Sequence, residues 1–415
     1  MGLFESVDAN GVLLNASRNV FANVTSAAHN AVTRKLAAQA MTLLKNEKDV
    51  LPLDDKSLNA IAVIGSQAAT PAVHGGGSGQ VFPAYVSDPL GAIRERFAGT
   101  ANCSTAGGGA HCVLYDDGKD LESVAATCKQ ADVGLVFVMA NSGEGQDRVT
   151  LELTNGWGGK GPTMTPLIEA AAAACKQTVV IMVSPGAVLT PWRDHVQGIV
   201  SAIMPGQEFG NAITDVLFGD VPSSGRLPFT IPAHADQMPF TQEQWPGVPA
   251  PAFPKNDPVG WRPGPETPMG ANGSSTYTEK LLIGHRYYDA HGLVPAFCFG
   301  HGLSLSSFEY SKLTASKATG VGFTLRNTGK RDAIEVVQLY LGFPEAAGEP
   351  PKVLKGFQLV SLKAGAAVEV TLPLNERALS IWDVAVHAWR VPAGEFTAMV
   401  GASSCNIRLN ATLAQ

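Results

Sequence analysis

The sequence predicts two folded regions: an α/β three-layer sandwich built on a mainly parallel sheet, followed by a β-sandwich. Three observations carry this prediction. Between residues 51 and 235, short apolar runs alternate with helical patterns, which is typical of parallel strands covered on both faces. From about 235 to 280 the composition shifts to proline, glycine and polar residues, as in a linker or functional loop, so 236–305 is expected to hold this loop and a connecting strand. From 306 to 415 the hydrophobic period becomes two, as in the short strands of a sandwich.

The individual elements follow from hydrophobic periodicity. Residues 1–50 are expected to hold a linker and one amphipathic helix over 28–46, whose apolar face comprises Val32, Leu36, Ala40, Leu43 and Leu44. Strands are expected next at 61–65, 133–140, 178–184 and 198–204, and helices at 119–130, 165–176 and 208–218. In the second region, alternating residues predict strands at 321–326, 334–340, 368–372 and 395–400.

Composition excludes several classes of partner. The 415 residues are 45% apolar and 16% charged, so the chain has enough apolar surface for a large core. A net charge of −6 without a long basic run argues against binding to nucleic acid or to an anionic membrane surface. No apolar run approaches the roughly 18 residues of a membrane-spanning helix.

Cysteines and glycosylation sequons point to the compartment. The six cysteines show neither a CxxC pair nor a Cys/His zinc spacing. Cys103 and Cys112 flank a short loop and form either a local disulfide or two free thiols. Five N-x-S/T sequons, at Asn15, Asn23, Asn102, Asn272 and Asn410, favour a secreted glycoprotein. The first residues, MGLFESVDANG, nevertheless lack the basic and apolar regions of a signal peptide.

The strongest candidate for catalysis is Glu144, in the octet NSGEGQDR at 141–148. The octet follows the buried strand expected at 133–140, and ligand sites of parallel sheets lie at the carboxyl ends of strands. Glycines on both sides of Glu144 let the backbone bend and a substrate approach closely, and a carboxylate there can act as a general acid/base. The alternative is a glutamate in a surface turn, or one that pairs with Arg148.

Other patterns carry weaker signals. The glycine cluster at 74–79 lacks the phosphate-loop pattern, so a tight loop lining a site is the better interpretation. Glu208, at the start of an expected helix, fits a capping or dipole role better than catalysis. GHRYYD at 284–289 is either a sugar-stacking or interdomain strand, or a structural packing segment. His195 and His301 are isolated and fit structural roles, and we expect neither a metal nor an organic cofactor.

Taken in order, several segments resemble glycoside hydrolase family 3, the β-glucosidase and β-xylosidase family. They are LAAQAMTLLKNEKDVLPL (36–53), IAVIG (61–65), GGGSGQVFP (75–83), GEGQDR (143–148), PGQEFGNAITDVLFGDVPSSGRLPFTIP (205–232), GHRYYD (284–289), FCFGHGLS (297–304), EVVQLYLG (335–342) and PPKVLKGF (350–357). Together they extend over nearly the whole chain, and jointly they are specific although no single one is.

The resemblance implies three domains in a full-length enzyme: a TIM-like barrel, an α/β/α sandwich and a fibronectin type III-like sandwich. It implies retaining hydrolysis of β-linked glucosides or oligosaccharides by two carboxylates, with an aspartate nucleophile on the barrel. Glu144 matches the family's general acid/base, Asp147 and Arg148 match the residues beside it, and Gly75, Gly76, Gly77 and Ser78 match a substrate-side loop. The chain departs from the family's usual pattern at His285, at 302–306, and in the short spacing between Gly145 and Asp147.

The resemblance also raises the question of the nucleophile, because no segment of this chain matches the barrel. Its first residues, MGLFE, resemble the segment that follows the barrel, so we expect Met1 to be an internal methionine of a longer secreted protein. The alternative is a gene that has lost its barrel. The first hypothesis is therefore the C-terminal portion of an exo-acting β-glucosidase-like enzyme, inactive alone, with a β-xylosidase as its rival. The second is a non-catalytic relic that binds carbohydrate or another protein.

Overall fold

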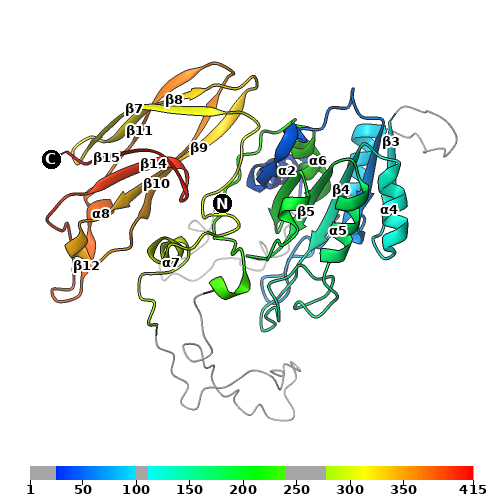
Figure 1. The fold of residues 1–415 in the computed structure, drawn as a ribbon, viewed down its shortest axis with the longest axis horizontal. Coiled ribbons are helices and arrows are strands. Elements are labelled where there is room, and N and C mark those ends of the chain that lie inside the picture. Colours follow the sequence, from blue (N-terminus) through cyan, green and yellow to red (C-terminus); the bar gives the residue numbers. More distant parts are fainter. Residues whose placement is uncertain (1–24, 99–110, 239–276, 415) are drawn as a thin grey trace, which may run out of the picture.

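The computed structural model describes residues 25–98, 111–238 and 277–414. These ranges form an α/β region and a β-sandwich that lie side by side, with a connecting segment (residues 277–305) between them in the chain (Figure 1). The connecting segment contains the helix α7 (His285–His291). The strand expected at GHRYYD is therefore wrong, because Gly284 starts this helix and Gly292, in the left-handed conformation with φ 62°, ends it.

The α/β region is built on one six-stranded sheet with the order β1, β6, β5, β4, β2, β3. All neighbours are parallel except β1, which runs antiparallel to β6 at the edge. The strands are β1 (Thr42–Asn46), β2 (Ala60–Ile64), β3 (Cys112–Asp116), β4 (Val133–Met139), β5 (Thr178–Val183) and β6 (Gly198–Ile203). Every residue of β4 and β5 is buried, as expected of strands covered on both faces.

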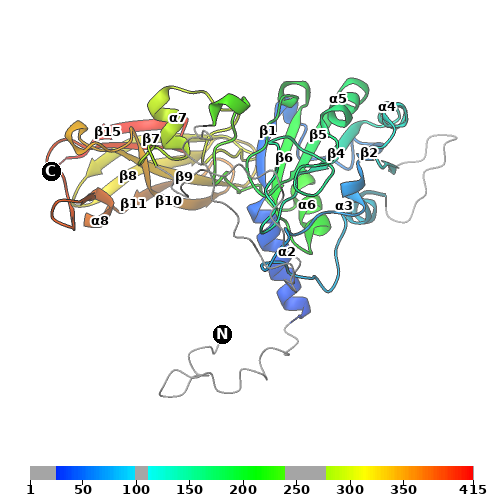
Figure 2. The same ribbon diagram turned by 90° about the horizontal axis from the view of Figure 1, so that it is seen from below.

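Two layers of helices enclose this sheet. The helices are α2 (Ala27–Ala40), α3 (Pro89–Ile93), α4 (Leu121–Lys129), α5 (Thr165–Ala174) and α6 (Phe209–Leu217). α4 packs against α5, and α6 packs against α2 and α3. The two groups lie on opposite faces of the sheet (Figure 2). Short turns are Glu47–Asp49, Ser66–Ala68, Arg193–His195, Ala235–Gln237 and Glu345–Ala347 of the 3-10 type, and Arg94–Ala98 of the π type.

The single long helix expected over 28–46 is wrong in its second half. α2 ends at Ala40, and residues 42–46 form β1, where Leu43 pairs with Val200 of β6. Val32 and Leu36 of α2 are more than half exposed, at 54% and 60%, whereas Leu43 and Leu44 are buried in the sheet. The apolar residues that mimic one helical face thus belong to two elements, one of which leaves its apolar side chains uncovered.

The second region is a sandwich of two antiparallel sheets. One has the order β10, β9, β14, β15 and the other β11, β8, β7. The elements are β7 (Phe308–Ser316), β8 (Gly320–Asn327), β9 (Ala333–Gly342), β10 (Val353–Leu362), β11 (Ala367–Leu372), α8 (Glu376–Leu379), a hairpin of β12 (Ile381–Asp383) and β13 (Ala388–Arg390), β14 (Thr397–Ser403) and β15 (Asn406–Thr412). Phe323, Leu339 and Phe396 fill the space between the sheets. The predicted fold class, a three-layer α/β sandwich followed by a β-sandwich, is confirmed.

Disulfides hold several elements together. Cys128 at the end of α4 bonds to Cys175 just after α5, and Cys298 of the connecting segment bonds to Cys405 between β14 and β15. Cys112 is also disulfide-bonded, so free thiols are wrong for every cysteine that the structure describes. Cys103, the partner in the local-disulfide hypothesis, lies outside the described residues.

A buried polar cluster joins the α/β region to the sandwich. Arg226 forms an ion pair with Glu335 of β9 at 3.3 Å, and both side chains are less than a tenth exposed. Tyr310 of β7 donates to the other oxygen of Glu335 at 2.9 Å, and Ser304 donates to the backbone of Ile334. Burial raises the pKa of Glu335 and lowers that of Arg226, so each charge depends on the other.

Arg226→Met should therefore destabilise the protein strongly, because Glu335 would remain buried without its cation. Removing one partner of a buried ion pair costs about 3–5 kcal/mol, and we expect a loss in this range in urea unfolding. The double variant Arg226→Met/Glu335→Gln is the matched control. It removes the uncompensated charge and should recover more than half of the loss. A single variant within about 1 kcal/mol of the parent, as for a surface pair, would contradict the argument.

His285 makes the free energy of unfolding depend on pH. The ring stacks on Phe299 with centroids 4.6 Å apart, and burial lowers its pKa from 6.5 to about 4 against the opposing effect of Asp289. In the unfolded chain the imidazole binds a proton near pH 6.5, whereas in the folded chain it binds one only near pH 4. Stability from His285 is thus complete above pH 6.5 and is lost as the pH falls toward 4, by at most about 3 kcal/mol.

We expect His285→Phe to preserve the stack on Phe299 and to reduce the loss of stability between pH 6.5 and pH 4. Urea unfolding at pH 7 and at pH 4 measures the effect. The parent should lose up to about 3 kcal/mol more than the variant between the two pH values. Equal losses in the parent and the variant would show that the His285 ring takes up its proton without resistance in the folded state.

Candidate active site

Glu144 lies at the tip of a tight turn just beyond the carboxyl end of β4. Gly143 and Gln146 close this turn with two backbone hydrogen bonds, of 3.3 Å from Gly143 N and 3.0 Å from Gln146 N. Gly145 completes it with a φ of 67°, which favours glycine. The turn exposes the Glu144 side chain at the edge of the sheet where parallel α/β folds place their ligands.

The glycine-rich loop after β2 pairs directly with this turn. Gly76 and Gly143 form a backbone bridge, and Glu144 N donates to Gly76 O at 3.1 Å. Gly76 N in turn donates to Ser142 O at 3.3 Å, close to Gly75. The structure thus brings Gly75, Gly76, Gly77 and Ser78 together with Glu144, although about 65 residues separate the two loops in the sequence.

Steric constraints explain the glycines in the paired loops. Gly77 has a φ of 98°, and an added Cβ would lie 2.3 Å from the Cβ of Glu144. A Cβ on Gly76 would lie 2.3 Å from the ring of Trp157, and one on Gly143 would lie 2.7 Å from the same ring. Side chains at these positions would therefore force the acid turn and the glycine loop apart.

Ser78 is the hydrogen-bonding partner of the Glu144 carboxylate, and its backbone N–H donates to Oε2 at 2.6 Å. Hydrogen bonding by the Ser78 side chain first, and then by its backbone N–H, lowers the pKa of Glu144 below its ordinary value. No neighbouring charge among the described residues contributes to the shift, and the side chain is exposed. Glu144 is therefore ionised at neutral pH, which suits a general base. To act as a general acid it would need a higher pKa, which removal of water from the carboxylate would provide.

Arg148 connects the turn to the next strand of the sheet. Its Nη2 donates to Ala187 O at 2.9 Å, in the loop after β5, while Nη1 is buried and has no partner within the part of the chain that the structure describes. Burial lowers the pKa of its guanidinium. Asp147 is exposed and, with Arg148, Ser142 and Glu152, lines a cavity of about 740 Å³. The hydrogen bond from Arg148 to Ala187 O connects the turn to the loop after β5. The resemblance implies that Arg148 orients the turn, and this bond would allow it to do so.

Trp157 is a site residue that the sequence analysis missed. It is 41% exposed and packs against both Gly76 and Gly143, and the adjacent Gly158 donates to Asn141 O at 3.2 Å. Its aromatic ring therefore packs against both loops where they pair. The available signal was an isolated tryptophan within NGWGGKG (155–161), a glycine-rich stretch that follows the candidate octet.

The remaining candidates have structural partners. Glu208 occupies the N-cap position of α6 but makes no side-chain capping bond, so the capping interpretation is wrong. Its carboxylate instead accepts hydrogen bonds from Tyr85 and from Asn211. His301 donates to Leu44 O at 2.8 Å, and His195 pairs with Glu169 at 2.8 Å.

The described residues contain no group of three or more His, Cys, Asp or Glu side chains that could hold a metal ion. None of the helices within residues 25–98, 111–238 and 277–414 combines the length and apolar character of a membrane span.

Comparison with known proteins gives the same picture of both regions. The glycosyl hydrolase family 3 C-terminal domain matches residues 41–304, and a fibronectin type III-like domain matches residues 335–404. Thermostable beta-glucosidase B of Acetivibrio thermocellus is 33% identical over 92% of this chain, and an exo-alpha-(1->6)-L-arabinopyranosidase of Bifidobacterium breve is 33% identical over 93%. The chain covers 48% and 49% of these two relatives, about half of their length.

Solved structures agree. A beta-D-glucoside glucohydrolase from Trichoderma reesei superposes with a TM-score of 0.78 at 30% identity, over 98% of this chain and 57% of that one. A family 3 beta-glucosidase from Bifidobacterium adolescentis gives 0.77 at 32% identity, over 94% of this chain and 54% of that one. From the matched domains, their order and this coverage, the chain belongs to glycoside hydrolase family 3 and corresponds to the C-terminal part of its β-glucosidase-like members.

Proposed function

We propose that this chain is the acid/base-bearing portion of an exo-acting retaining β-glucosidase that removes terminal β-linked glucose. The observation that supports it most is the geometry of Glu144. Two paired backbone loops hold an exposed carboxylate at the ligand edge of a parallel sheet, with Ser78 N donating to it at 2.6 Å. Glu144 would protonate the leaving oxygen and later deprotonate the attacking water, and Asp147 and Arg148 would support its turn.

In this proposal, the chain supplies one of the two carboxylates that the reaction needs. A retaining glycosidase needs a nucleophilic carboxylate about 5–5.5 Å from the acid/base. A carboxylate at that distance would raise the pKa of Glu144, yet Ser78 lowers it and no described acidic side chain contributes. We therefore place the nucleophile on a barrel domain of a longer protein. That domain would also desolvate Glu144 and make its protonated form accessible at neutral pH.

Uncovered apolar surface near the site supports such a partner domain. Val81 and Phe82, which follow the glycine loop, are 71% and 81% exposed. Val81 lines a cavity together with His29 and Asn30 of α2, the helix that also exposes Val32 and Leu36. Exposed apolar groups of this size beside a polar site are typical of surfaces that another domain covers.

Two other functions compete with this proposal. One is a different exo-glycosidase specificity, such as a β-xylosidase, because most of the sugar-binding pocket would lie on the barrel. The relatives include an exo-alpha-(1->6)-L-arabinopyranosidase, which illustrates how specificity differs among similar chains. The other is a barrel-less relic that binds carbohydrate or another protein. The glycine constraints around Glu144 favour the enzyme, since a binding relic does not require a fixed carboxylate.

We also propose that the parent protein is secreted and glycosylated. Asn410 of β15, one of the five sequons, is exposed and thus open to modification. The other four sequons lie outside the described residues.

The proposal predicts no turnover of aryl β-glucoside or aryl β-xyloside by the 415-residue chain. Fusing the N-terminal half of the Acetivibrio relative to this chain should restore hydrolysis. In that fusion, Glu144→Gln should slow an alkyl glucoside about 10²–10⁴-fold, the usual contribution of general acid catalysis. A dinitrophenyl glucoside should be affected much less in the glycosylation step, because its leaving group needs no proton.

The matched control is Glu122→Gln, which changes an exposed glutamate on α4 and should leave both rates unchanged. Turnover by the unfused chain that disappears with Glu144→Gln would mean that a nucleophile lies within this chain. Loss of both substrates to the same extent in the fusion would remove Glu144 from the acid role.

A second prediction concerns the loop pairing. Gly77→Ala should push Glu144 away from Ser78 N, because the new methyl group lies within 2.3 Å of the Glu144 Cβ and the φ of 98° strains any side chain. The pKa of Glu144 should rise toward its ordinary value in a carboxyl ¹³C NMR titration, with Glu144→Gln used for assignment.

Gly79→Ala is the matched control for this titration. Gly79 belongs to the same loop, and an added Cβ there meets no atom within 4 Å. The pKa of Glu144 should stay depressed in this variant. An unchanged pKa in Gly77→Ala would show that Ser78 does not set the acidity of Glu144.

A further inference from the structure

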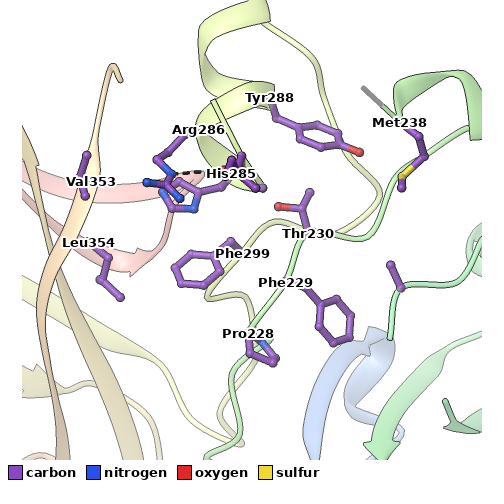
Figure 3. A pocket seen from close by; sticks show the side chains of 13 residues that line it. Pro228, Phe229, Thr230, Met238, His285, Arg286, Tyr288, Phe299, Val353 and Leu354 are labelled. Carbon is purple, nitrogen blue, oxygen red and sulfur yellow. Dashed lines mark hydrogen bonds between the residues drawn. The ribbon is translucent and has the colours of Figure 1, made fainter. Parts of the chain in front are cut away.

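A separate cavity of about 470 Å³ lies where the α/β region, the connecting segment and the sandwich meet (Figure 3). Its walls come mainly from residues 228–230 after the sheet, from 283–286 and Tyr288 at the start of α7, from Phe299, and from 353–354 at the start of β10. This volume falls in the range of small-molecule sites. Since a cavity of about 150 Å³ can hold benzene, this one has room for more than one ring.

The lining is mainly aromatic and aliphatic. Phe229, Phe299 and Tyr288 lie around the cavity, and Leu354 and Ile283 add aliphatic surface. The His285 ring stacks on Phe299 and extends the aromatic surface. Flat apolar walls of this kind favour a planar aromatic ligand, which gains both apolar burial and ring contacts.

Two polar atoms at this site are buried without a hydrogen-bond partner among the described residues: Thr230 Oγ1 and His285 Nε2. Thr230 itself is only 9% exposed. Buried polar atoms are nearly always paired, so each of these two requires an explanation. Burial lowers the pKa of His285 to about 4, so the ring is neutral at pH 7 and carries one proton. In the tautomer with that proton on Nδ1, Nε2 is a hydrogen-bond acceptor.

The cavity is separate from the turn of Glu144, but Ala187 connects the two. Ala187 lines the cavity, and its carbonyl oxygen is the one that receives Arg148. Arg286 also lines the cavity, and its Nε donates a hydrogen bond to Ile283 O at 3.2 Å. The polar groups that a ligand meets therefore include one acceptor, His285 Nε2, and the Thr230 hydroxyl, beside the Arg286 guanidinium and the Tyr288 hydroxyl.

We propose that this junction cavity is a binding site for a neutral two-ring phenol, whose hydroxyl group donates to His285 Nε2. The rings lie against Phe299 and the aliphatic wall, and Thr230 supplies the second polar contact. The site does not depend on hydrolysis at Glu144, so it exists in this chain whether or not a barrel is present.

Calorimetric titration of the 415-residue chain with 2-naphthol and with its methyl ether, 2-methoxynaphthalene, tests the proposal. The two probes have the same rings, but only the first can donate a hydrogen bond. We expect saturable binding of one molecule per chain, with naphthol bound about tenfold more tightly, the usual value of one hydrogen bond to a buried acceptor. His285→Phe keeps the stacking ring and should remove this preference while retaining binding of the ether.

Leu354→Trp serves as the second variant, because the larger side chain fills the cavity and should weaken both probes at least tenfold. Thermal unfolding of each variant confirms that it is folded before titration. The proposal is overturned by absence of saturable binding to the parent chain. It is equally overturned by a naphthol preference that persists in His285→Phe, or by unchanged binding in Leu354→Trp.

Discussion

The backbone pairing between the glycine loop and the acid turn is the constraint on which the candidate site depends. One bridge between Gly76 and Gly143 fixes the separation of two loops that come from different strands. The bridge also brings Ser78 to the Glu144 carboxylate, and the Ser78 side chain and backbone N–H together lower the pKa of Glu144. The pairing is close enough to exclude side chains at three glycines, and it rests on the Trp157 ring. The parallel sheet provides the edge, but the loop contact determines where the carboxylate points.

This arrangement leaves the acid exposed, and that exposure shapes the functional argument. A carboxylate in water with one backbone donor is a stable anion, whereas a general acid must hold a proton near neutral pH. The same side of the chain exposes Val81 and Phe82, and the chain spans about half of its relatives. Desolvation and the missing carboxylate would both come from one covering domain. The buried Arg226–Glu335 pair shows that the chain already uses desolvated charge at its other junction, between the α/β region and the sandwich.

Much of the fold could be predicted from the sequence, for identifiable reasons. Fully buried parallel strands such as β4 read as continuous apolar runs, and the alternating residues of β8 mark one face of a sandwich. The helix expected over 28–46 is correct only as far as Ala40, because residues 42–46 pair with β6 as β1 and bury Leu43 and Leu44 in the sheet. The strand interpretation of GHRYYD is wrong because Gly284 and Gly292 cap a helix there, in which Tyr288 is buried. The family resemblance singled out Glu144 and the glycine loop as candidates, because the octet alone left Glu144 open between an acid/base and a surface-turn residue. The role of Trp157 depends on a contact between distant loops.

The central claim is that this chain supplies the acid/base and not the nucleophile. The most direct test treats the unfused chain and the barrel fusion with dinitrophenyl 2-deoxy-2-fluoroglucoside, which traps the nucleophile as a glycosyl-enzyme ester. Intact mass measurement followed by peptide mapping locates the label. The account predicts no covalent label on the unfused chain, and in the fusion a single label outside residues 1–415. A fluoroglucosyl group on any carboxylate within those residues would contradict it.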